Sequence, residues 1–514
     1  MTTQNTALSV HPLGESNLEE ESSVSLDTFG GKLHVEWSPQ AAVTPLGQLP
    51  FFIEFLKTAE LFEPWVWECP LEYRSNNAPS KRDVLGTILL SILAGQKRYA
   101  HIAAIRADGV NPGLLGMGKV VSEDAVRRSF QGVDVADCAA WQLRHLRRCY
   151  DSLLVEPWIL DLDVTVKPLY GHQEGAVVGF NPHKPGRPSH TYHTYFLANL
   201  RLVLDVEVQA GNKTAAKHTS PSFFAFLDGL PRELRPAFVR GDCSYGNEDV
   251  MRSCEERGLD YLFKLRQTRK VKQLVEKLYA QSAWVAAGQD WEGVESKLRL
   301  TGWTSDRRVI VLRRALKGDG FVENKKAEGQ LEFAFMETFG TVKKYEYAVL
   351  VTSLGEGILT LAQHYRDRAD AENPFDELKN HWGWGGFTTH DQHRCQIMAR
   401  HTALIYNWWN LFSRLAVPGK HIEALTSRPL LLHAVGKQTQ HAGQTTLTLT
   451  SMHAESRRVR RALRDLTGFL GAVRAAAEQL DWARRWALIL SRAFIAFLKG
   501  RPVGVPRKLA IGMT

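Results

Sequence analysis

The chain has 514 residues, a formal net charge of +9 and a pI near 9.1, and 44% of its residues are hydrophobic. This length predicts roughly two to four domains with a packed core, and the basic balance favours a polyanionic partner. The six cysteines are scattered without a CxxC pair, which argues against a zinc module or a disulfide framework and indicates a reducing compartment. The N-terminus has no signal-peptide pattern, and the most apolar late segment, residues 487–498, is too short to span a membrane.

The first part of the chain changes from a polar tail to a helical region. Residues 1–30 are polar, acidic and rich in Ser and Thr, so we expect a disordered tail. Residues 31–150 show helical spacing of apolar residues, and Ser122 caps a predicted helix that presents Arg127 and Arg128. These basic helices and glycine turns fit either a helix-turn-helix-like DNA-binding domain or an ordinary helical domain with solvated arginines.

After Pro157 the spacing of apolar residues changes from a helical period to the alternation that is typical of β-strands. The predicted strand at residues 158–166 carries Asp161 and Asp163 at alternate positions, so both acids point to the same side. A later short strand ends in Asp242. Strands, a crossover helix, a strand, a helix and a strand follow in an order that predicts a mixed α/β sheet. We assign residues 151–282 to the first part of this core.

A second β-rich segment interrupts the core. Residues 283–347 read as an insertion, and its last strand, residues 347–352, is expected to return to the main sheet. Residues 348–416 then complete the core and end in an apolar, aromatic helix at residues 392–415. Residues 417–514 are predicted to form a helical, arginine-rich C-terminal region.

One predicted helix gathers four polar side chains on a single face. Tyr365, Arg368, Glu372 and Lys379 fall within roughly 60° of one another at about 100° per residue. Such a face suits a carboxylate that holds a divalent cation and cations that bind phosphate, whereas the alternative is a solvated side laced with ion pairs. Pro374 lies inside this segment, so a kink or a restart of the helix is expected there.

Three acids stand at comparable places in the predicted fold: Asp163 in the first strand, Asp242 at the end of a later strand, and Glu372 on the helix. Three carboxylates at one sheet edge would suit Mg²⁺ or Mn²⁺. Two such ions, about 4 Å apart, can activate a water or a 3′-hydroxyl for attack on a phosphodiester. Each acid taken singly also has a structural explanation, such as a strand end, a turn or a helix cap.

The spacing on the helix matches the Tyr-(2)-Arg-(3)-Glu-(6)-Lys signature of one large branch of the DDE insertion-sequence transposases. The Asp-Val-Thr sequence at residues 163–165 resembles the first-Asp motif of that branch, Asp-x-Thr, and Arg-Gly-Asp-Cys-Ser-Tyr at residues 240–245 is similar to its second-Asp motif. A β-rich insertion between the second Asp and the Glu is also typical of the branch. The resemblance extends over residues 158–415.

The resemblance implies an RNase H-like mixed sheet flanked by helices, interrupted by the insertion, with two Mg²⁺ or Mn²⁺ ions in the active site. The implied catalytic and metal-holding residues are Asp163, Asp242 and Glu372, and the implied DNA contacts are Tyr365, Arg368 and Lys379. Asp161 is a weaker candidate ligand because it lacks the following Thr. In such enzymes the insertion often holds a displaced base against an aromatic ring. Trp284, Trp291 and Trp303 are candidates for this role, or they are core residues.

The expected function is cut-and-paste transposition, in which water cleaves the transposon end and the freed 3′-hydroxyl attacks target DNA. The expected partners are the terminal inverted repeats, the target DNA and a second copy of the chain in a synaptic complex. The expected location is a bacterial cytoplasm, at the nucleoid, with no membrane contact. A stand-alone metal-dependent nuclease and a domesticated, non-catalytic DNA-binding protein are the alternatives. A Rossmann oxidoreductase is disfavoured because no GxGxxG follows the first strand.

Overall fold

The computed structural model describes most of the chain. It covers residues 23–38, 41–73, 75, 77–181, 184–213, 215–281, 283–316, 345–419, 421–451 and 454–504, without the side chains of 23, 215–221, 280–281 and 369–372. The predicted tail falls mainly on residues 1–22, which lie outside this part. Residues 23–28 form a strand, so the structure differs from the predicted tail there.

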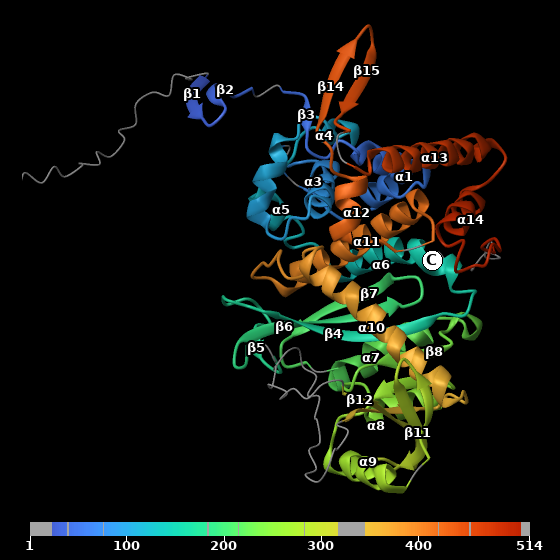
Figure 1. Cartoon of the computed structure of the whole chain (residues 1–514). Coiled ribbons are helices and arrows are strands. Elements are labelled where there is room, and N and C mark those ends of the chain that lie inside the picture. Colours follow the sequence, from blue (N-terminus) through green and yellow to red (C-terminus); the bar gives the residue numbers. More distant parts are fainter. Residues whose placement is uncertain are drawn as a thin grey trace, which may run out of the picture.

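The helices and strands follow in the order labelled in Figure 1. The N-terminal elements are β1 (Ser23–Thr28), β2 (Gly31–Glu36), β3 (Val43–Thr44), α1 (Leu49–Thr58), α2 (Phe62–Trp67), α3 (Lys81–Leu93), α4 (Asn111–Leu114), α5 (Glu123–Arg128) and α6 (Val135–Tyr150). The central elements are β4 (Ile159–Pro168), β5 (Val177–Val178), β6 (Pro188–Leu197), β7 (Leu202–Ala210), α7 (Ala215–Asp228), β8 (Phe238–Gly241), α8 (Glu248–Glu256), β9 (Tyr261–Lys264), α9 (Arg269–Gln281), β10 (Val285–Gly288), β11 (Trp291–Leu298), β12 (Arg307–Ala315) and β13 (Tyr345–Thr352). The C-terminal elements are α10 (Ile358–Asn380), α11 (Gln392–Ala416), α12 (Ala424–Leu431), β14 (Gly436–His441), β15 (Gln444–Leu449), α13 (Ser456–Ala475) and α14 (Trp482–Ala493).

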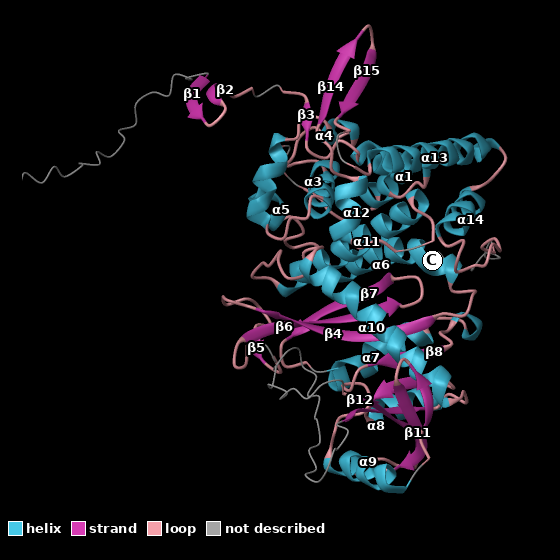
Figure 2. Cartoon of the chain, viewed as in Figure 1, coloured by secondary structure: helices cyan, strands magenta, loops and turns pink. Residues whose placement is uncertain are grey.

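The centre of the molecule is a mixed sheet in which β7, β6, β4, β8 and β9 lie side by side. The β4–β6 and β6–β7 pairs are antiparallel, whereas β4–β8 and β8–β9 are parallel and are joined through helical crossovers. Neighbouring residues of β6 face opposite layers: the Phe196 ring lies 5.3 Å from Phe375 of α10, and the Tyr195 ring 5.9 Å from Phe223 of α7. The sheet therefore lies between helices, and the core is RNase H-like, as the resemblance implied (Figure 2).

The predicted insertion continues the central sheet. Strand β13 pairs antiparallel with β9, which confirms the expected return of the last strand, and β12, β11 and β10 follow it outward in one ladder. On one face of this extension, Ile310 of β12 and Leu350 of β13 pack with Leu361 of α10 in a hydrophobic cluster. A strand was also predicted at residues 331–335, which lie outside the described part of the chain.

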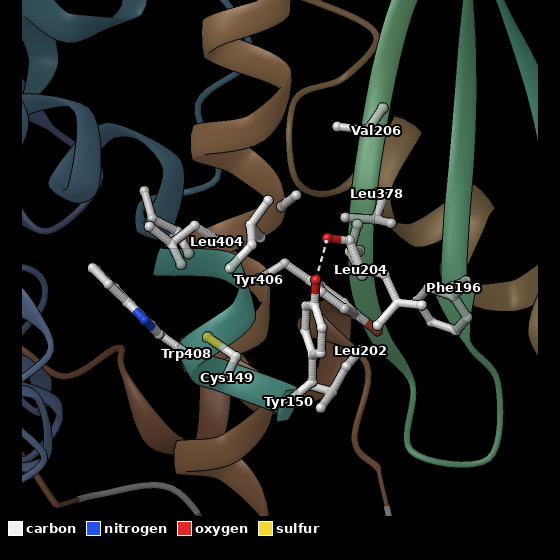
Figure 3. Close-up of a cluster of buried hydrophobic side chains, with 14 of the residues drawn as sticks. Cys149, Tyr150, Phe196, Leu202, Leu204, Val206, Leu378, Leu404, Tyr406 and Trp408 are labelled. Atoms are coloured by element: carbon white, nitrogen blue, oxygen red, sulfur yellow. Dashed lines mark hydrogen bonds between the residues drawn. The ribbon is translucent and has the colours of Figure 1, made fainter. Parts of the chain in front are cut away.

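The helices before and after the core pack together in one layer. The rings of Phe52 in α1 and Phe412 in α11 lie 5.2 Å apart, and those of Trp65 in α2 and Trp408 in α11 lie 5.4 Å apart. Where α6 and α11 meet β7, the Tyr150 hydroxyl donates to the Leu204 carbonyl at 3.3 Å (Figure 3). The N-terminal and C-terminal helices thus share one hydrophobic core with α11. Within the described residues, no helix is both long and apolar enough to cross a membrane.

The C-terminal region contains a β-hairpin as well as the helices that the sequence predicts. Strands β14 and β15 pair antiparallel, and β14 also pairs with β3. The two-residue turn has Ala442 at φ +49° and Gly443 at φ +78°, the left-handed pair that tight hairpins require. Alternating threonines in β15 favour a strand, so the prediction of an entirely helical region over residues 417–514 was wrong at this hairpin.

Candidate active site

Two of the predicted acids lie next to one another, Asp163 in the middle of β4 and Asp242 directly after the adjacent parallel strand β8. The register of β4 and β8 pairs Asp161 with Arg240 and Leu162 with Gly241. The next residues are Asp163 and Asp242, so their backbones lie beside each other at about the 4.8 Å spacing of neighbouring strands. Both residues are partly exposed. The strand topology therefore brings together two acids that are 79 positions apart along the chain, since 242 − 163 = 79.

The turn after β8 holds Asp242 in place. A Cβ atom at Gly241 would lie 2.7 Å from the buried ring of Tyr245, so this close packing requires glycine. The backbone N–H of Ser244 donates to Asp242 Oδ1 at 2.9 Å. Asn247 then caps α8 by accepting from the N–H of Val250. The Gly-Asp sequence thus forms a tight turn that fixes the carboxylate at the end of the strand.

Asp161 is fully occupied by a buried ion pair. Arg240 donates to its two carboxylate oxygens at 2.6 and 2.8 Å, and these two side chains are 0% and 2% exposed. The remaining Arg240 nitrogen, Nη1, donates to the backbone carbonyl of His364 in α10. Buried charges offset the cost of leaving water only when they are paired and hydrogen-bonded, as both are here. The Asp161–Arg240 pair therefore joins β4, β8 and α10. Its two residues stand two positions before Asp163 and Asp242 along the chain.

Helix α10 also contacts the first predicted acid directly. Arg368, one turn after His364, donates from Nη2 to Asp163 Oδ1 at 3.3 Å, and its side chain is only 3% exposed. Thr165 donates to Asp163 Oδ2, also at 3.3 Å. A guanidinium beside adjacent carboxylates reduces their mutual repulsion. Arg368 is thus a buried part of the site, in contact with Asp163.

The four residues of the helical signature do lie on one continuous helix. Helix α10 extends through Pro374 to Asn380, so it does not end and restart at the proline. Tyr365 is half-buried against the cluster beneath α10, and Lys379 is half-buried near the end of the helix. Glu372 follows Arg368 by one turn of this helix. Its side chain lies outside the described part of the structure.

The donor set at this sheet edge fits a hard divalent cation. Mg²⁺ and Mn²⁺ prefer carboxylate and water oxygens, and Asp163 and Asp242 supply carboxylates at adjacent positions. Among the described side chains, no cluster of three or more His, Cys, Asp or Glu residues forms a metal site. That search does not include the side chain of Glu372, which is the third acid that the sequence singles out.

The three tryptophans of the insertion each lie beside an arginine. The guanidinium carbon of Arg313 lies 3.9 Å from the Trp284 ring centre, that of Arg314 4.9 Å from Trp291, and that of Arg307 5.2 Å from Trp303. Trp303 is buried in the main core. Trp284 and Trp291 are half-buried. A base-holding role for any of the three tryptophans stays a prediction.

Sequence reasoning missed the contribution of Arg240. In the sequence, Arg240 stands out only as part of the second-Asp motif. Its ion-pair partner could not be predicted, because that partner depends on the register between two strands far apart in the chain. One signal was present: a charged residue in a short strand of otherwise apolar residues needs a buried partner. Asp161, at an alternate position of the first strand, was the available acid.

Comparisons with known proteins identify the family of this chain. The family described as transposase DDE domain, group 1, matches residues 72–469. Among curated proteins, none matches the chain. Among solved structures, a cryo-EM structure of the piggyBac transposase synaptic complex with hairpin DNA is similar at a TM-score of 0.37 and 10% identity, covering 88% of this chain and 85% of that chain. Because the family match spans most of its length, this chain belongs to the DDE transposases of domain group 1.

Proposed function

We propose that this transposase cuts DNA at transposon ends and joins the freed 3′ ends to target DNA, with Asp163, Asp242 and Glu372 as its three catalytic acids. The observation that carries the proposal is the adjacent placement of Asp163 in β4 and Asp242 directly after β8, with the helix that bears Glu372 in contact with Asp163 through Arg368. Family membership supports a metal-dependent reaction on DNA.

The three carboxylates are proposed to hold two Mg²⁺ or Mn²⁺ ions. When bound, such ions polarise the scissile phosphate and lower the pKa of the attacking water or hydroxyl. The protein's own contribution is to fix the acids. Ser244 orients Asp242, and Thr165 and Arg368 orient Asp163, each through a hydrogen bond. These bonds reduce the reorganisation needed at the moment of reaction.

The remaining residues of the helical signature are proposed to contact DNA phosphates. Arg368 would meet the phosphate at the acids, because its guanidinium already lies against Asp163. Tyr365 and Lys379 are half-buried on the same helix and would bind phosphates on either side. The proposed partners are the terminal inverted repeats, target DNA and a second copy of the chain in a synaptic complex. The proposed location is the bacterial nucleoid.

The test uses the full-length protein and duplex DNA that contains the repeats flanking its gene. Asp163→Asn, Asp242→Asn and Glu372→Gln should each abolish Mg²⁺-dependent strand cleavage, while duplex affinity stays within about threefold of wild type. The matched control is Asp249→Asn, an exposed acid in the first turn of α8, which should cleave normally.

Wild-type cleavage by any of the three acid variants would remove that residue from the catalytic set. Cleavage by the wild-type protein without joining to a target duplex would instead favour a stand-alone nuclease. Binding without any cleavage would favour a DNA-binding protein that has lost its activity.

A further inference from the structure

The β14–β15 hairpin projects from the helical layer (Figure 1). One of its two faces is made of exposed polar side chains. The register pairs Lys437 with Thr448, Thr439 with Thr446 and His441 with Gln444. All six side chains are exposed, and because paired residues share a side, they form one surface. We call these six residues the hairpin face. It has no apolar member and no carboxylate.

The base of the hairpin is fixed to the body of the protein. Gly436 and Lys437 pair with β3, and the N–H of Gln438 donates to the Ala42 carbonyl at 2.8 Å. On the side opposite the hairpin face, Leu447 and Leu449 cover Gly436. An isolated two-stranded hairpin is marginally stable in water, so this anchoring determines the direction in which the hairpin face points.

A row of arginines begins a few residues after the hairpin. Helix α13 buries Val459, Leu463, Leu466, Leu470 and Val473. Arg457, Arg461 and Arg464 are exposed, and at about 100° per residue they lie on the side opposite the buried row. Between positions 436 and 464 the chain has six Lys and Arg residues and one acid, Glu455, so the local excess is 6 − 1 = +5.

These two surfaces together match the chemistry of double-stranded DNA. The arginine row complements the phosphate backbone, and the major groove of B-DNA is wide enough for a two-stranded β-ribbon. Side chains of Lys, Gln, His and Thr can donate or accept hydrogen bonds at base edges and phosphates. The hairpin face has no apolar residue with which to form a hydrophobic contact with a second copy of the chain.

We propose that the hairpin face and the arginine row of α13 form a duplex-DNA binding surface, with the hairpin in a groove and the arginines on the adjoining phosphates. The surface belongs to the side of the molecule opposite the β10–β13 extension (Figure 1). It lies outside the acidic site at the β4–β8 edge. The inference rests on the proposed function only in that both take DNA as the partner.

The first measurement is the affinity of the full-length protein for a mixed-sequence duplex of about 30 base pairs, roughly three helical turns. Thr439→Glu places a negative charge on the hairpin face and should weaken binding about tenfold or more. Gln440→Glu is the matched control, because the next residue of the same strand is exposed but points to the other face. It should weaken binding clearly less.

The second measurement is the salt dependence of that affinity. The double variant Arg457→Gln, Arg464→Gln should flatten the slope of log affinity against log salt by about 1.8, since each lost phosphate contact contributes about 0.9. Arg484→Gln removes an exposed arginine of α14 and should leave the slope unchanged.

Equal affinities for wild type, Thr439→Glu and the double arginine variant would overturn the inference. If those variants changed the oligomeric state in sedimentation while binding DNA normally, the surface would be a contact between copies of the chain instead. Metal-dependent cleavage by the wild-type protein separates the two proposals, because it tests the acids independently of the hairpin. Loss of cleavage with intact hairpin-dependent binding would reject the proposed function alone.

Discussion

Arg240, in β8, makes three side-chain hydrogen bonds to two other elements of the core, β4 and α10. Its side chain bridges Asp161 in β4 and the His364 carbonyl in α10, and Asp242 directly follows its own strand, β8. Each of these elements carries or directly precedes one of the proposed catalytic acids. A change of a few tenths of an ångström between them would alter the geometry of a metal site. We therefore regard Arg240 and Asp161 as positioning residues.

The contribution of the Asp161–Arg240 pair to folding stability can be measured separately from its role in positioning the proposed catalytic acids. Arg240→Met leaves the Asp161 carboxylate buried without its cation, and should cost about 3–5 kcal/mol of unfolding free energy. The double variant Asp161→Leu, Arg240→Met removes both charges and should recover most of that loss. Because the bond to His364 is still missing, its cleavage rate should stay well below wild type.

Denaturant unfolding and single-turnover cleavage of the same preparations check this expectation. Recovery of both stability and cleavage in the double variant would mean that the pair has no positioning role. Apparent Mg²⁺ affinity gives a further readout, because a displaced acid weakens metal binding even in a fully folded protein.

At the scale of single elements, α10 carries the contacts on which the site depends. Its continuity through Pro374 keeps Lys379 on the same helix as Arg368. If Lys379 binds a phosphate, Lys379→Ala should flatten the salt slope of duplex binding by about 0.9. The matched control is Lys277→Ala, an exposed lysine of α9. Equal slopes for Lys379→Ala and wild type would make Lys379 a surface charge without a role in binding.

The elements that the sequence predicted best are those whose pattern is local. Strand β4, strand β8 and helix α11 agree with prediction to within about two residues, since apolar alternation and helical spacing identify them directly. The hairpin is less apparent from the sequence, because its strands are short and polar and it lies next to the arginine-rich helical segment of residues 456–475. The sequence of residues 285–315 alone does not predict that β10, β11 and β12 continue the central sheet, because strand pairing depends on residues far away in the chain.

At the scale of the whole molecule, burial of histidines makes the helical layer sensitive to acid. His401 is buried among the rings of Trp65, Phe130 and Trp141, and this burial lowers its pKa from 6.5 to about 3. In the unfolded chain the His401 ring takes up a proton below about pH 6.5. In the folded protein the same ring stays neutral down to about pH 3. The free energy of unfolding should therefore fall by about 1.4 kcal/mol per pH unit over this range.

Thermal unfolding at several pH values between 7 and 5 measures this dependence. His401→Gln should reduce the fall of Tm with acidity, even if it also lowers Tm at neutral pH through altered packing. His441→Gln, in the exposed hairpin, should keep the wild-type dependence. An unchanged pH slope in His401→Gln would show that other groups dominate the acid response.

The shared core of the first and last helices also determines when the protein can complete its fold. Phe52 packs against Phe412, which the ribosome adds 412 − 52 = 360 residues later. At about 5–20 residues per second, roughly 20–70 s pass between the two. During that time the apolar faces of α1, α2 and α6 have no partner from α11. A newly made chain therefore exposes these apolar faces until translation is nearly finished, and a prematurely terminated chain would leave them exposed.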